Sequence, residues 1–414
     1  MAGKAAGIYS ICSANRFVIE AAMLQAKADG SVLCIEATSN QVDQFGGYTG
    51  MTPVHFVAYV KSIALLLEFP FEKVLLGGDH LGPNAWRKES ADSAMAKARE
   101  LLTAYAKAGF TKIHLDASMK CASDPGAAPS PKVIAERAAE LCLASEAAGT
   151  NPVYIVGTEV PTPGGATSEH EGLHVTRVED VEETITEMHA AFKKLKLEKA
   201  WERVHAVVVQ PGVEFGDASV DLYDSKKAQG LAGYIKKHPN LVYEAHSTDY
   251  QSGKCLTELV RDHFAVLKVG PWLTFALREA VFAMENMEKE YLGKKSGVTL
   301  SKFQETLEKV MLKQPEYWKN YYKGSETEVV IKRKYSYSDR CRYYWPVADV
   351  NSALERLLEN LKKHTPPVTL LSQYMPNQYA AINSGLIKYS PETLIHSKIM
   401  EVTSIYSKAC NLEK

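Results

Sequence analysis

The sequence lacks the cysteine pattern of a secreted or zinc-stapled protein. Its 414 residues include only seven cysteines, which are scattered, and no two of them form a CxxC pair. An odd number of isolated cysteines argues against a disulfide framework and leaves no thiolate pair for a structural zinc ion. We therefore expect reduced thiols and a cytoplasmic protein.

Long apolar runs and an excess of charge are missing too. Apolar stretches such as IALLLEF at 63–69 fall well short of the roughly 20 residues that a membrane-spanning helix needs. The 48 basic residues nearly balance the 49 acidic ones, which gives a formal net charge of −1. Such a chain has no general positive field to attract nucleic acid or an anionic membrane, so we expect neither as a partner.

Two nucleotide-binding motifs are also absent. No GxGxxG turn follows the first apolar run, and no GxxxxGK[ST] loop occurs in the chain. Their absence argues against a dinucleotide-binding doubly wound sheet and against a P-loop kinase.

What the sequence does contain is a series of eight short apolar runs, each ending in a polar or glycine-containing turn. Helix-like segments with Ser starts or Gly stops lie between several of them, as at 17–30, 90–109 and 130–149. Continuous runs of this kind are typical of parallel strands covered by helices. The runs span residues 7–13, 31–38, 73–80, 111–118, 152–159, 204–210, 241–247 and 265–270.

Eight strands that alternate with helices predict an α/β fold, a (β/α)8 TIM barrel over residues 1–300. A doubly wound sheet is the competing architecture. Residues 301–414 differ in character, with helical patterns and a β-like piece at 328–346. We expect this part to be a mainly helical C-terminal extension that packs on the barrel.

Polar side chains stand at nearly every predicted strand end. In barrels of this type the active site lies at the carboxyl ends of the strands, where the following loops meet. Ordinary capping explains one or two such residues, but not nearly all of them. The strand ends carry Ser13, Asn15, Glu36, Asp79, His80, Asn84, Asp116, Ser118, Glu159, Gln210, Glu244, His246 and Lys268.

Two of the histidines suit a metal ion. His80 adjoins a carboxylate, and His246 ends a strand across the barrel, with Glu159, Gln210 or Glu244 available between them. Imidazole and carboxylate donors fit Zn²⁺, Mn²⁺ or a similar divalent ion. The alternative is a pair of core histidines held by backbone hydrogen bonds.

Another histidine, His114, lies inside its strand. It precedes Asp116 by two residues, so both should face the same side of the barrel, with His114 one layer deeper. It is a less attractive ligand on this ground.

Phosphate is often held by the loops after the seventh and eighth strands of such barrels. Here these loops are 246–254 and 268–275, where Ser247 and Thr248 offer donors and Lys268 offers charge. A buried lysine at this position could instead pair with a carboxylate. Arg340 and Arg342 lie among aromatic residues, where a guanidinium suits either phosphate or a structural clamp between extension and barrel.

Several long strings carry a resemblance to a known family. ICSANRFVIEAA (11–22), LLGGDHLGPN (75–84), VYEAHSTDYQ (242–251) and SDRCRYYWP (338–346) resemble the GatZ/KbaZ/AgaZ family, and the resemblance covers nearly the whole chain. This family is described as the second subunit of D-tagatose-1,6-bisphosphate aldolase. The resemblance implies a (β/α)8 barrel related to class II, metal-dependent aldolases, with a place in galactitol, N-acetylgalactosamine or tagatose catabolism.

The resemblance to class II aldolases also implies catalytic roles at three strands. Asp79 and His80 match a pair in which the aspartate is the acid/base and the histidine binds metal. Asp116 matches the end of the fourth strand and is the next acid/base candidate. Glu159, at the fifth strand, completes the catalytic set or the metal shell.

The metal and substrate residues follow from the same comparison. His246 matches a ligand histidine that precedes a phosphate loop, whereas Gln210 stands where the aldolases place a further metal-binding histidine. The predicted ligands are therefore His80, His246 and Gln210, for Zn, Mn, Ni or Co. The predicted substrate- or phosphate-binding residues are Ser13, Asn15, Asn84, Ser118, Ser247, Thr248, Lys268 and Arg340.

Two functions follow from this resemblance. One is metal-dependent retro-aldol and aldol chemistry at C3–C4 of a ketohexose or its phosphate, as a fructose/tagatose (6-phosphate) 4-epimerase or an aldolase component. The alternative is a non-catalytic, chaperone-like subunit that stabilises and activates a separate class II aldolase chain. A homo-oligomer is compatible with both.

Overall fold

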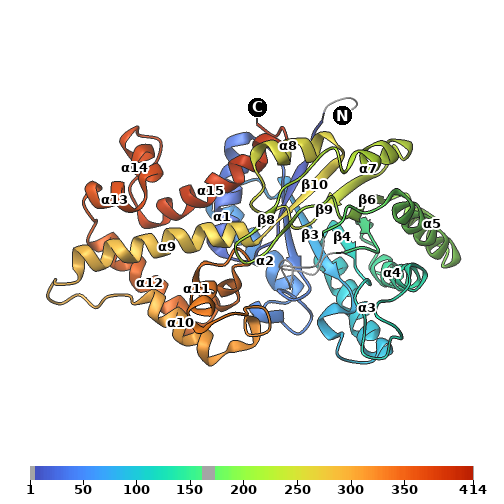
Figure 1. Ribbon diagram of the computed structural model, residues 1–414, viewed down its shortest axis with the longest axis horizontal. Helices are drawn as coiled ribbons and strands as arrows, with labels where there is room; N and C mark the ends of the chain where they lie inside the picture. The colour runs from blue at the N-terminus through green and yellow to red at the C-terminus, as the bar shows by residue number, and fades with distance from the viewer. Residues whose placement is uncertain (1–4, 161–172, 414) are drawn as a thin grey trace.

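The eight central strands close into a parallel barrel. A computed structural model describes residues 5–160 and 173–413 (Figure 1). Around the barrel the order is β1-β10-β9-β6-β5-β4-β3-β2, and a separate antiparallel pair is formed by β7 and β8. The closed ring confirms the predicted (β/α)8 architecture over the doubly wound alternative. The strands are β1 (Ile8–Ile11), β2 (Leu33–Thr38), β3 (Val74–Leu81), β4 (Lys112–Leu115), β5 (Val153–Val156), β6 (Val204–Val209), β7 (Glu214–Phe215), β8 (Val220–Asp221), β9 (Val242–Ala245) and β10 (Phe264–Val269).

Helices cover the outside of this barrel. Their ends follow the local sequence signals: the Ser90 hydroxyl accepts from Ser93 N at the start of α3, and Gly109 ends that helix at a φ of 93°. No helix in the described ranges has the length and apolarity to cross a membrane. The helices of the barrel are α1 (Arg16–Asp29), α2 (Pro53–Leu66), α3 (Ala91–Ala108), α4 (Pro131–Glu146), α5 (Val178–Lys194), α6 (Glu198–Trp201), α7 (Gln229–Tyr234), α8 (Gly253–Arg261) and α9 (Pro271–Leu292).

The C-terminal part is helical and returns to the barrel. Its last helix, α15, lies against α1 and α9, so the two ends of the chain meet on one flank (Figure 1). A backbone bond from Gly7 N to Cys410 O, 3.1 Å long, joins them directly. The helices here are α10 (Phe303–Lys313), α11 (Glu326–Tyr335), α12 (Ala348–Lys363), α13 (Val368–Tyr374), α14 (Pro376–Asn383) and α15 (Pro391–Ala409).

The prediction of a β-like piece at 328–346 is wrong. This segment forms α11 and a 3-10 turn, η6 (Arg340–Tyr344). Ser325 and Glu328 form a capping box, in which each side chain bonds the backbone N–H of the other. This local cap satisfies two N–H groups of the first turn, which outweighs the β-propensity of the short run Val329–Ile331.

The backbone is unusually tight where β3 ends. A Cβ atom on Gly82 would lie 1.6 Å from Asp116 O, so only glycine fits between the ends of β3 and β4. His80 and Ser247, at the ends of β3 and β9, are non-glycine residues with φ values of 49° and 54°. Residues held in this left-handed region cluster at functional sites, and both lie at the carboxyl end of the barrel.

Candidate active site at the mouth of the barrel

Three imidazole rings meet inside the carboxyl end of the barrel. The ring centroids of His80 and His246 are 4.9 Å apart. The ring centroid of His114 lies 5.3 Å from that of His80 and 5.4 Å from that of His246. All three rings are buried. The structure thus brings together the two histidines chosen from the sequence, and it adds His114 from the deeper layer.

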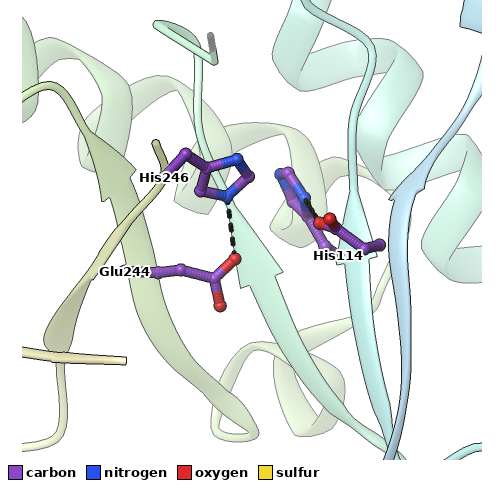
Figure 2. A group of neighbouring side chains, drawn as sticks. His114, Glu244 and His246 are labelled. Atoms are coloured by element: carbon purple, nitrogen blue, oxygen red, sulfur yellow. Dashed lines mark hydrogen bonds and ion pairs between the residues drawn. The ribbon is translucent and has the colours of Figure 1, made fainter. Parts of the chain in front are cut away.

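Four of the buried side chains form what we call the mouth cluster, namely Asp79, His114, Glu244 and His246. One ligand atom from each lies within 4.8 Å of the others. Figure 2 shows His246 and Glu244 joined by a hydrogen bond, with His114 beside them. His246 Nε2 lies 3.0 Å from Glu244 Oε1, and His114 Nδ1 lies 3.0 Å from Asp79 Oδ1.

The mouth cluster fits a divalent cation. The Nε2 atom of His114 is fully buried and has no hydrogen-bond partner among the described residues. A buried polar atom without a partner is unfavourable, and a ligand removes the penalty. Burial lowers the pKa of His246, which keeps its imidazole neutral as a metal ligand requires. Two imidazoles and two carboxylates suit Zn²⁺, Mn²⁺ and related ions.

His80 belongs to a different arrangement. Its Nδ1 lies 2.8 Å from Asp116 Oδ2, and its Nε2 lies 3.6 Å from Asp79 Oδ2. Burial by itself would lower the pKa of His80, but the carboxylates of Asp79 and Asp116 outweigh it and raise the pKa to about 9. Asp116 is fixed in turn by Ser118, whose hydroxyl donates to it at 2.6 Å. His80 is therefore an oriented, proton-holding group outside the mouth cluster.

Two lysines balance the acidic charge beneath the rings. Lys112 pairs with Glu36 and, at 2.7 Å, with Glu244. Lys268 pairs with Glu36 and, at 3.0 Å, with Asp79. Burial would raise the pKa of Glu244, but Lys112 and the nearby imidazoles lower it to about 2. Lys268 thus lies among carboxylates, which corresponds to the alternative interpretation of this residue.

Sequence reasoning missed Lys112 as part of this network and rated His114 too low. The signal was the two-residue period of β4, since Lys112 and His114 alternate with apolar residues and precede Asp116 on the same face. All three are buried in the barrel interior.

Two predicted residues of the fifth and sixth strands are engaged elsewhere. The Gln210 Oε1 atom accepts from the backbone N–H groups of Gly212 and Val213 at 2.8 Å and 3.0 Å, which closes the turn after β6. The Glu159 carboxylate accepts from the Thr176 hydroxyl at 2.6 Å. The structure therefore does not bring either side chain to the mouth cluster.

Two of the predicted substrate-binding residues have other contacts, and a third lies away from both cavities of the mouth. The Thr248 hydroxyl donates to Lys268 O at 2.7 Å. The guanidinium of Arg340 lies 3.1 Å from the ring centre of Tyr321 and bonds Tyr317 O, as a structural clamp would. Asn84 lies in a half-buried turn after β3 and lines neither cavity of the mouth.

Two adjoining cavities open at the mouth. The smaller, of about 90 Å³, is lined by His80, His246, Ser247 and Lys268 among others. The larger, of about 360 Å³, is lined by Ser13 and by residues of α1, α2 and α12. The two share the side chains of Cys12, Gln41, Tyr48 and Arg342.

The fold and this site define a (β/α)8 barrel protein with a candidate metal centre at the carboxyl ends of its strands. Residues 1–411 match the family described as "D-tagatose-1,6-bisphosphate aldolase subunit GatZ/KbaZ-like", and the chain belongs to this family. This confirms the resemblance drawn from the sequence.

Individual relatives agree with the family match over the full length. The chain is 48% identical over 414 residues to the D-tagatose-1,6-bisphosphate aldolase subunit GatZ of Salmonella enteritidis PT4, covering 99% of this chain and 97% of that one. It is equally similar to the Escherichia coli SMS-3-5 subunit of the same name, at 48% over 416 residues. A crystal structure titled a probable tagatose 6 phosphate kinase from Sinorhizobium meliloti 1021 is 46% identical, with a TM-score of 0.90 over 98% of this chain and 100% of that one.

Proposed function

We propose that this protein carries out metal-dependent retro-aldol and aldol chemistry at the C3–C4 bond of a ketohexose phosphate. It would act as a fructose/tagatose 6-phosphate 4-epimerase or as a component of a tagatose-1,6-bisphosphate aldolase. The mouth cluster carries this proposal, because four buried ligand-type side chains from three strands converge beside a cavity. Family membership supports the class of substrate.

The ion would be held by the mouth cluster. His114 supports this assignment best, because its buried Nε2 has no partner among the residues described. When bound, a divalent ion supplies positive charge that polarises a substrate carbonyl. His80 and Gln210 were predicted as ligands from the sequence. Their contacts favour another role for His80 and a turn-closing role for Gln210.

Proton transfer at the C4 oxygen falls to His80 in this proposal. Its ring lines the smaller cavity, and Asp116 orients it through Nδ1. In cleavage of the C3–C4 bond the C4 hydroxyl gives its proton to the neutral form of the His80 imidazole, which is the minor form below its pKa of about 9, and in the reverse step the imidazolium returns the proton to the new hydroxyl. Asp79, the acid/base favoured by the sequence, adjoins His80 and is the second candidate for this proton transfer. Asp116 would act indirectly, by orienting His80.

The rest of the substrate would lie along the two cavities. Ser247 and the carboxylate-paired Lys268 line the smaller cavity, while Ser13 and Asn15 line the larger one. A non-catalytic role remains the second proposal, since the curated relatives are named subunits of an aldolase. In that case the partner would be a class II aldolase chain.

One assay series tests both proposals. The full chain is stripped of metal, supplied with Mn²⁺, Zn²⁺, Ni²⁺ or Co²⁺, and assayed for interconversion of fructose 6-phosphate and tagatose 6-phosphate and for cleavage of tagatose 1,6-bisphosphate. We expect metal-dependent turnover that falls at least about 100-fold in His246→Ala. The matched control, His55→Ala, removes an exposed imidazole of α2 and should keep full activity.

A chain that is inert with every ion would contradict the enzymatic proposal. If the same preparation raised the activity of a separate class II aldolase chain, the subunit role would be the correct one.

A further inference from the structure

Arg342 stands in the wall between the two cavities. It lies in η6 of the C-terminal extension and lines both of them. Its Nη1 donates to Ser338 O and, at 3.1 Å, to Asp339 O, while its Nη2 donates to Tyr343 Oη at 3.0 Å. A guanidinium carries five N–H groups, so two remain without an acceptor among residues 5–160 and 173–413. No carboxylate in the described part of the chain lies within 4.0 Å of its nitrogens.

The neighbouring arginine shows the contrast. Arg340 is buried, covers the ring of Tyr321 and lines neither cavity. Arg342 is two residues further along the same 3-10 turn and faces the mouth instead. The turn itself is fixed to α9, because Thr274 donates to Asp339 at 2.6 Å and Arg278 lies 3.5 Å from the same carboxylate. These contacts with α9 therefore fix the position of the turn that carries Arg342.

The larger cavity has the size and the charge of an anion subsite. Ligand pockets typically measure about 300 Å³ or more, so the larger cavity falls in this range and the smaller one alone does not. The charged side chains that line the larger cavity are Arg16, Arg342 and Glu355. Arg16 is paired with Glu20 at 2.6 Å, and Glu355 accepts from Asn351 at 2.8 Å. Among the basic side chains of this lining, Arg342 is the one without a carboxylate partner in the described part of the chain.

We propose that the larger cavity is a subsite for the far end of the sugar, and that Arg342 binds a phosphate ester carried by that end. The guanidinium fork can offer a phosphate two parallel N–H bonds, which a lysine ammonium cannot. The inference rests on the proposed function only in one respect, namely that the reacting end of the sugar lies at His80. Binding at Arg342 itself requires a phosphate ester and no turnover.

The consequence concerns selectivity. The extension, rather than a barrel strand, would distinguish a phosphorylated ketohexose from a free one. Removing Arg342 should therefore weaken binding of the phosphorylated sugar alone.

Calorimetric titration of the full chain tests this, with tagatose 6-phosphate and unphosphorylated tagatose as probes. In Arg342→Met we expect the affinity for tagatose 6-phosphate to fall about 10- to 100-fold, the range of a charge-assisted hydrogen-bond pair. The affinity for tagatose should stay within about twofold. Arg342→Lys keeps the charge without the fork and should lose less. Equal loss for both sugars, or a native protein that binds the two equally, would overturn the subsite.

Two controls keep the result interpretable. Arg342 also bonds its own turn, so the thermal midpoint of each variant is measured, and Arg342→Lys serves where Arg342→Met unfolds early. Arg356→Met removes an exposed arginine of α12 and should leave both affinities unchanged. Selective phosphate binding without turnover would support the subsite and contradict the proposed activity, while turnover with no selective loss in Arg342→Met would do the reverse.

Discussion

The mouth cluster and the seam between α1 and α15 both bury charge, but they satisfy it differently. At the seam, the buried Glu20 accepts from Arg16 at 2.6 Å and lies 2.7 Å from His396 Nε2. The buried Asp29 accepts from Gln25 and from Ser407. At the mouth, by contrast, His114 keeps a buried nitrogen with no partner in the ranges described.

This contrast distinguishes a polar cluster whose charges are all paired within the protein from one that still has an atom available to a ligand. A buried carboxylate whose partners are all protein groups stabilises a contact between two elements. A buried nitrogen without a partner has a stability penalty that a bound ion or an ordered water molecule removes. The same residue types therefore serve the fold at the seam and are available for chemistry at the mouth.

The largest effect, on metal affinity, should come from removing His114 and its unpartnered Nε2 atom. In His114→Ala we expect the affinity for Mn²⁺ or Zn²⁺ to fall at least about 100-fold, because a ligand is lost and Asp79 loses the group that orients it. Titration of the metal-free chain with each ion measures the change. Unchanged affinity would show that the mouth cluster is not the metal site.

A second prediction concerns the seam. Glu20→Gln should lower the free energy of unfolding by about 1–3 kcal/mol at neutral pH, since Arg16 and His396 lose a charged acceptor. Metal affinity should not change. Denaturant unfolding and metal titration of the same variant test both parts, and a loss of metal affinity would erase the distinction between the two regions.

The seam also predicts a pH dependence. Burial would raise the pKa of Glu20, but His396 and Arg16 outweigh it and lower the pKa below its usual value. A lowered pKa adds stability above the unfolded value of about 4.3, and this stability is lost as the pH falls through the folded value. The difference in stability between the native chain and Glu20→Gln should therefore be constant above about pH 5 and should shrink as the pH falls from about 5 to about 3. A difference that stays constant over this range would exclude the ion pair as its source.

The smallest effect is expected at the exposed start of α11, which belongs to neither region. Ser325→Ala removes the side-chain cap of α11. It should lower the free energy of unfolding by only about 1 kcal/mol, because a single cap at an exposed helix end is lost. Thermal unfolding measures the loss. A change in sugar or metal binding would show that α11 is coupled to the mouth.

The fold could be predicted because its signals are local. The eight apolar runs, the Ser starts and the Gly stops each report on a few neighbouring residues, and together they specified a closed barrel. The failure at 328–346 is of the same local kind, since the cap formed by Ser325 and Glu328 lies before the apolar run that suggested a strand.

The site could be predicted only in part, because it depends on distant contacts. His80 and His246 stand at strand ends, so topology alone brings them together. Gln210 and Glu159 also follow strands, yet the turn at Gly212 and the hydroxyl of Thr176 occupy their side chains. Arg340 and Arg342 differ only in the direction that a 3-10 turn gives each, which no pattern in the sequence reports.

The meeting of α1 with α15 has a consequence for biosynthesis. Helix α1 packs most extensively on α15, and the contact of Glu20 with His396 joins residues more than 370 positions apart. A chain emerging from the ribosome therefore has all of its barrel strands well before α15, and the flank of the barrel at α1 stays uncovered until α15 has been made. Ribosome-bound chains halted before Pro391 should accordingly be far more susceptible to proteolysis and chaperone capture than chains that include α15.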